Sequence, residues 1–157
     1  MLTFDYFIKN GYEKDCSQWI AYSLNEITKY NNDPKLYTLA LKNFQDNVER
    51  LHNSSIAPTS FELVNCVYET YQRLLSNNIK LDYAEKNFKL DELTETIEYR
   101  LQRLLDNYFF PEYAMYMKSP SRILNTFYVR QESFRTRIDD VQHSVGGLYI
   151  YYNNFDY

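Results

Sequence analysis

The sequence predicts an all-α fold of about five helices arranged in antiparallel hairpins. Apolar residues recur at three- and four-residue steps in five separate segments, which is the period of one helical face. Short links join the first three segments, and such links favour antiparallel neighbours. Residues 126–129 are the one candidate for a strand, supported by two β-branched residues. We therefore expect a single helical domain across residues 1–157.

The first two helices are predicted from their periodicity and from one start signal. The first spans residues 15–30, where apolar residues recur at helical steps. Asp33 followed by Pro34 marks the start of the second helix, because an N-cap aspartate and a proline at the first helical position suit a helix N-terminus. Its apolar stripe continues to about His52.

The third and fourth helices have clear ends. The third is expected over residues 58–78, and Thr59 and Glu62 have the spacing of a capping box at its start. The fourth is expected over residues 91–108, and Pro111 stops it. Both segments carry leucine-rich apolar faces, so we expect both to pack in the interior.

The last helix is predicted to start near Thr136 and to place several apolar residues on one side. These are Ile138, Val141, Val145, Leu148 and Tyr152. Gly146 and Gly147 lie within this helix, where each glycine costs about 1 kcal/mol relative to alanine. We expect compensation through close approach of another backbone or of a ligand.

A connection of about 24 residues, 110–133, separates the last two helices. Such a long connection in a compact domain is usually functional or disordered. Its aromatic content argues against disorder, and the residues concerned are Tyr113, Tyr116, Phe127 and Tyr128. Glu112 is either a functional loop carboxylate or an exposed loop acid.

Composition excludes few functions. Hydrophobic residues make up 45% and charged residues 24%, as in ordinary soluble proteins, and a net charge of −4 argues against non-specific nucleic-acid binding. No apolar run is long enough to span a membrane and the N-terminus lacks signal-peptide features, so we expect a cytoplasmic protein. Cys16 and Cys66 are expected to be buried free thiols in a reducing compartment.

The aromatic content is high, with 17 Tyr and 10 Phe. Aromatic rings supply flat, amphipathic contact area, so one interpretation is a ligand-facing or partner-facing surface. The other is codon bias in an AT-rich genome, which enriches Tyr together with Asn, Lys and Ile.

Ionisable residues gather at the start of the last helix. Asp139 and His143 are four residues apart and therefore share a helical face. A carboxylate beside an imidazole orients its proton, so Asp139 or Asp140 with His143 could perform acid–base catalysis. Arg135 and Arg137, just upstream, could hold an anionic or polyhydroxylated ligand.

The same cluster has a structural interpretation. Asp139 and Asp140 lie in a first helical turn, where acids complement the helix dipole without any further role. The two arginines could pair with these acids or with Glu132, and the histidine could be a hydrogen-bonded structural residue. Both interpretations stay open at the level of sequence.

No cofactor or metal is predicted. His52 and His143 are far apart in sequence, and neither cysteine has a second cysteine at ligand spacing. The sequence contains neither a glycine-rich phosphate loop nor a Gly-x-Ser-x-Gly motif.

The last 50 or so residues include NYFFPEYAMYMKSPSRILNTFYVRQESFRTRIDDVQHSVGGLYIYY. A helix leads through an aromatic loop to the motif FRTRIDDVQH, which opens another helix. This block resembles the closing hairpin of α/α-toroid proteins, the helical-hairpin barrels that include many carbohydrate-active enzymes and terpenoid-cyclase-like domains. The resemblance implies that the chain is a fragment of a longer polypeptide, because a full toroid needs more helices than this chain supplies.

Two functions follow from these observations. The first is a helical binding or scaffold domain that contacts a protein partner, or a second copy of itself, through an aromatic surface with a charged patch at the start of the last helix. The alternative is part of a carbohydrate-active toroid enzyme with a saccharide ligand. Its pocket would be lined by Tyr113, Tyr116, Tyr128, Arg135, Arg137, Asp139 and His143.

Overall fold

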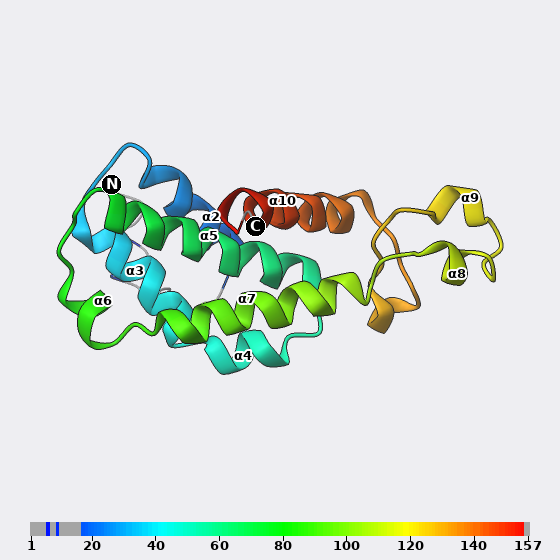
Figure 1. Cartoon of the computed structure of the whole chain (residues 1–157), viewed down its shortest axis with the longest axis horizontal. Coiled ribbons are helices and arrows are strands. Elements are labelled where there is room, and N and C mark those ends of the chain that lie inside the picture. The colour runs from blue at the N-terminus through cyan, green and yellow to red at the C-terminus, as the bar shows by residue number, and fades with distance from the viewer. Residues whose placement is uncertain (1–5, 7–8, 10–16, 156–157) are drawn as a thin grey trace.

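The computed structural model describes residues 6, 9 and 17–155, and this part of the chain is all-α, as the sequence predicts (Figure 1). The five described helices of ten or more residues match the number expected: α2 (Gln18–Ile27), α3 (Pro34–Gln45), α5 (Ala57–Ser76), α7 (Leu90–Leu105) and α10 (Ile138–Asn154). The short helices are α4 (Val48–Asn53), α6 (Asp82–Lys86), α8 (Pro111–Ala114) and α9 (Pro120–Ile123). The predicted start of the first helix, with Cys16, lies outside the described residues.

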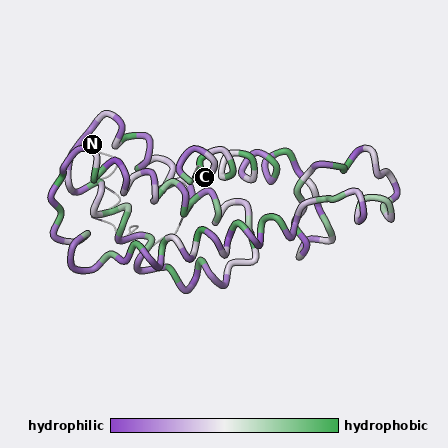
Figure 2. The backbone as a smooth tube through the Cα atoms, in the orientation of Figure 1, coloured by the Kyte–Doolittle hydropathy of each residue, from purple (hydrophilic) through white to green (hydrophobic). Residues whose placement is uncertain are grey.

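The long helix α5 is the centre of the bundle. Helices α2, α3, α7 and α10 all pack against it. The core between them is formed by fully buried apolar side chains such as Tyr37, Phe44, Phe61, Val64 and Ile97. Apolar and polar stretches alternate along the bundle helices, as Figure 2 shows, and this is the amphipathic pattern from which the helices are predicted.

The prediction of one continuous second helix is wrong, because the structure contains two helices, α3 and α4, in its place. Helix α3 ends at Gln45 with Asp46 as its C-cap, and α4 begins at Val48. Asn47 between them has φ −126° and ψ 11°, and its side-chain amide donates to the carbonyl of Asn43. Aspartate and asparagine favour caps over helix interiors because their side chains compete for backbone hydrogen bonds.

The predicted capping box at the start of α5 is also wrong. The helix begins at Ala57 with Ile56 as its N-cap, and no side chain caps it. Thr59 therefore lies inside the first turn. Glu62 is buried and bonds to His143 of α10 instead of to the backbone of the first turn. The end of α5 is confirmed, since Asn77 is its C-cap and Asn78 has a left-handed φ of 53°.

The connection between α7 and α10 is an ordered arm, residues 106–137, that extends beyond the end of the bundle (Figure 1). Two isolated antiparallel bridges, Tyr108 with Phe127 and Val129 with Arg135, replace the strand predicted at 126–129. Backbone hydrogen bonds extend the first bridge, including Phe109 N–H to the carbonyl of Thr126 at 2.9 Å. The expectation that this connection is ordered is confirmed.

Helix α10 lies unusually close to α5. A Cβ atom on Gly146 would be 2.8 Å from Oε1 of Glu62, and one on Gly147 would be 2.7 Å from Cδ1 of Phe61. The predicted close approach at the two glycines is therefore confirmed, and the neighbour is another helix. As a result, α10 buries Asp140, Ser144 and Gly147, whereas several residues of its apolar side remain exposed.

Candidate functional site

Five charged residues meet where the arm enters α10. The buried carboxylate of Asp140 accepts hydrogen bonds from Arg135 (Nη2 to Oδ2, 3.4 Å) and Arg137 (Nε to Oδ2, 3.3 Å). Arg137 also pairs with Asp139 at 2.9 Å, and Arg135 pairs with Glu132. The hydrogen bond to Asp140 raises the pKa of Arg137 above its usual value. The arginines and acids thus pair with one another and fasten the arm to the first turn of α10, although Nε of Arg135 is buried without a hydrogen-bond partner.

His143 is bound to a residue that the sequence does not single out for this role. Its Nδ1 lies 2.6 Å from Oε2 of Glu62 on α5, while Asp139 is held by Arg137. Burial raises the pKa of the Glu62 carboxyl, and the hydrogen bond from the imidazole opposes that rise. The exposed Trp19 ring and the imidazole meet in a T-shaped contact, with ring centroids 6.0 Å apart. The expected pairing of Asp139 with His143 is not what the structure contains.

A carboxylate inside an apolar run is the sequence signal that could have identified Glu62. Glu62 precedes the apolar residues Leu63 and Val64, and all three side chains are buried. A buried carboxylate needs a hydrogen-bonding or charged partner. One turn further along α5 lies Cys66, a free thiol buried as predicted, and burial raises its pKa, so it stays protonated and unreactive.

The predicted tyrosines meet in a separate place, on the arm. Tyr113, Tyr116 and Tyr128 line a hollow of about 330 Å³ together with Phe109, Met117, Arg130 and Phe134. The Tyr128 ring packs between Phe109 (centroid distance 4.3 Å) and Phe134 (5.2 Å). The Tyr128 hydroxyl donates to the carbonyl of Asp106 at 3.0 Å.

The two predicted groups of site residues do not share this hollow. Arg135, Arg137, Asp139 and His143 are absent from its lining, and Arg130 is the arginine that reaches it. Arg130 donates to the carbonyl of Asp106 at 3.3 Å and to the Tyr128 hydroxyl at 3.4 Å. The hydrogen bond to Tyr128 raises the pKa of Arg130. The hollow is therefore an aromatic surface with one cation at its edge.

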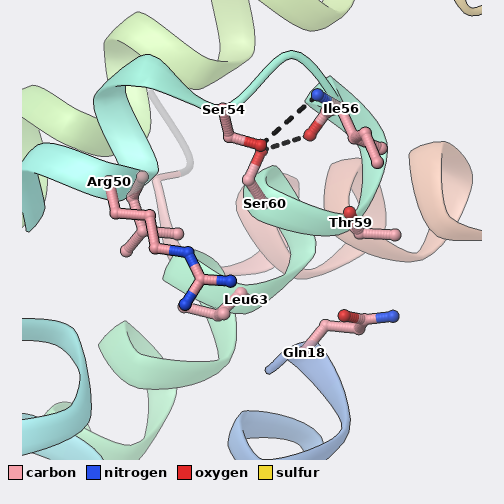
Figure 3. A pocket seen from close by; sticks show the side chains of 8 residues that line it. Gln18, Arg50, Ser54, Ile56, Thr59, Ser60 and Leu63 are labelled. Carbon is pink, nitrogen blue, oxygen red and sulfur yellow. Dashed lines mark hydrogen bonds between the residues drawn. The ribbon is translucent and has the colours of Figure 1, made fainter. Parts of the chain in front are cut away.

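A second hollow of about 170 Å³ lies between α2 and the corner that joins α4 to α5 (Figure 3). Its described lining contains one arginine, Arg50, and no carboxylate. Within the lining, the Ser60 hydroxyl donates a hydrogen bond to the carbonyl of Ile56 at 2.6 Å. A volume below the range of about 300–1,000 Å³ for drug-sized ligands suits a small polar or anionic group. None of these residues is predicted as a site from the sequence.

The buried guanidinium of Arg100 fixes this corner. Its Nε donates to Oγ of Ser60 at 2.9 Å, and its other nitrogens donate to the carbonyls of Ser54 and Ile56 at 3.0–3.1 Å. Burial lowers its pKa to about 10. Arg100 is a structural clamp, because all three of its nitrogens are used to hold the α4–α5 connection.

Comparison with known proteins adds no identity. No protein-family model, no curated protein and no solved structure matches the chain. Within the described residues, no group of three or more His, Cys, Asp and Glu side chains is placed to hold a metal ion. Likewise, none of the described helices combines the length and apolar character needed to cross a membrane.

Proposed function

We propose that this chain is a helical binding module whose arm binds another protein. The supporting observation is the gathering of Tyr113, Tyr116 and Tyr128 around one hollow at the protruding end of the molecule. Phe110, Met115 and Phe134 add exposed apolar surface nearby. Tyrosine, arginine, methionine and phenylalanine are enriched at protein interfaces, where a few such residues carry most of the binding energy.

The rigidity of the arm favours binding. The two backbone bridges and the packed, tilted rings of Phe109, Tyr128 and Phe134 shape the hollow without any partner. A pre-formed site loses less conformational entropy on association than a flexible one. A volume of about 330 Å³ accepts one large apolar or aromatic side chain, and Arg130 at the edge suits an acidic neighbour in the same partner segment.

Selection from a random peptide library on the immobilised protein tests this proposal. Selected peptides should carry an aromatic or large aliphatic residue beside an acid. Calorimetry should show at least tenfold weaker binding to Tyr116→Ala, which is about 1.4 kcal/mol, because the hollow loses one wall. Tyr30→Ala is the matched control, since Tyr30 is similarly exposed but lies after the C-terminal end of α2, outside the arm. Equal affinity for both variants would remove the arm from the proposed function.

Trp19 favours a second candidate function, a carbohydrate-active site that uses His143. An exposed indole is a suitable platform for a sugar ring, and here it borders an imidazole bound to a buried carboxylate. In this candidate, Glu62 orients the imidazole, while Asp139 and Asp140 stay bound to their arginines. The sequence contains a single tryptophan, so its fluorescence reports on this site directly. Oligosaccharides that leave the emission unchanged at millimolar concentration would eliminate the candidate.

A further inference from the structure

The outward side of α10 carries a regular apolar stripe. Ile138, Val145 and Tyr152 recur at seven-residue steps, and their side chains are 90%, 54% and 68% exposed. Tyr149 adds a fourth residue, 69% exposed. At a rise of 1.5 Å per residue the stripe is about 21 Å long. A seven-residue apolar repeat is the pattern by which one helix packs against another.

No described part of the chain covers this stripe. Helices at a protein surface usually turn their apolar side inward and their polar side outward. Helix α10 instead has apolar residues on two sides. Leu148, Ile150 and Tyr151 pack against the core, while the stripe faces outward. The close approach at the glycines and the bond between Glu62 and His143 fix this orientation.

The stripe also lacks the charges of a solvated face. Residues 141–155, VQHSVGGLYIYYNNF, contain no Lys, Arg, Asp or Glu. Charged side chains normally cover the exposed side of a surface helix and limit contiguous apolar area. An uncharged face with exposed valine and tyrosine is typical of a surface that another helix covers.

We propose that α10 pairs with α10 of a second copy of this chain, about a two-fold axis that passes near Val145. The stripe is self-complementary, since Ile138 and Tyr152 are each seven residues from Val145. In an antiparallel pair, Ile138 of one copy meets Tyr152 of the other, and the helix dipoles oppose each other favourably. Apart from the paired Arg137 and Asp139 beside Ile138, the face carries no charge, so two identical faces meet without net repulsion.

The available area is that of a small specific interface. The exposed parts of Ile138, Val145, Tyr149 and Tyr152 amount to about 500 Å² per copy, estimated from the exposed fractions and typical side-chain areas. Burial on both copies would total about 1,000 Å², the size at which specific interfaces begin.

Charge substitution at the axis tests the pairing. Wild-type protein at about 50 μM should sediment and scatter light as a dimer, whereas Val145→Glu and Val145→Lys should each weaken self-association at least 100-fold. An equimolar mixture of the two variants should dimerise again, because a two-fold axis at this position brings opposite charges together. Rescue of this kind also shows that both variants are folded.

Two variants elsewhere serve as controls. Tyr30→Glu introduces the same charge at an exposed aromatic residue outside α10, and Tyr116→Ala alters the arm hollow; both should remain dimeric. The arm proposal is tested by peptide binding and does not depend on this result. A monomeric wild-type protein, a dimer that persists in Val145→Glu, or a mixture that stays monomeric would each overturn the pairing.

Discussion

Gly147 is the position at which α10 approaches α5 most closely. A Cβ atom there would lie 2.7 Å from Cδ1 of Phe61 and 3.3 Å from the backbone nitrogen of Glu62. Non-bonded carbon atoms prefer separations of about 3.5–4.0 Å. The Phe61 ring is fully buried and packs on Tyr151, with ring centroids 6.0 Å apart, so it cannot turn aside freely. Alanine at position 147 would force the two helices apart.

Gly147→Ala therefore combines two opposing effects on the free energy of unfolding. Alanine is favoured over glycine in a helix interior by about 1 kcal/mol, which would stabilise the protein. Over-packing a close-packed interior costs about 1–3 kcal/mol. We expect the cost here to lie near the upper end of that range, because the added Cβ would contact both a buried ring and a backbone atom. We expect a net loss of about 1–2 kcal/mol, and a larger loss for Gly147→Val.

Urea unfolding followed by circular dichroism measures this loss, at one fixed protein concentration because self-association would add to the apparent stability. Gln142→Ala is the control. It lies on the exposed side of the same helix, so we expect a change within about 0.5 kcal/mol. An increase in stability of Gly147→Ala would refute the conclusion that helix contact requires glycine here.

Two further predictions concern buried polar groups. Arg100→Met should lower the free energy of unfolding by about 3 kcal/mol in the same urea assay, because the carbonyl of Ser54 and the hydroxyl of Ser60 lose their buried donor. A loss below about 1 kcal/mol would contradict the clamp. Gly146→Ala should destabilise the wild type, since its Cβ meets Glu62, but should stabilise the Glu62→Ala variant by about 1 kcal/mol. Additive effects in this double-mutant cycle would show that the two residues do not interact.

Local signals predicted the long helices well. Asp33 with Pro34 begins α3 as expected, with the Asp33 side chain accepting from the amide of Lys35, and Asn77 ends α5. Such caps depend on neighbouring residues in the chain, so they can be read from the sequence. The short helices α6, α8 and α9 were missed because segments of four or five residues carry too little periodicity.

The candidate site was predicted less completely. Arg135, Arg137, Asp139 and Asp140 are close in sequence, and the structure brings them together as a charged cluster. Glu62, the partner of His143, is 81 residues away on another helix, and no local sequence pattern predicts a contact over that separation. The three tyrosines predicted to line a pocket all line one hollow, but with Arg130 in place of the arginines at the start of α10.

The amino-acid sequence alone determined the helical class, the five long helices, the ordered aromatic arm and the need for close packing at two glycines, because each depends on residues within a few positions of one another. Only the tertiary structure decided which side of α10 is buried. Apolar periodicity shows that a helix has an apolar side, whereas the orientation of α10 follows from backbone contact at Gly147 and from the bond between His143 and Glu62. These long-range contacts set the rotation of α10 about its axis, and they leave Ile138, Val145 and Tyr152 exposed.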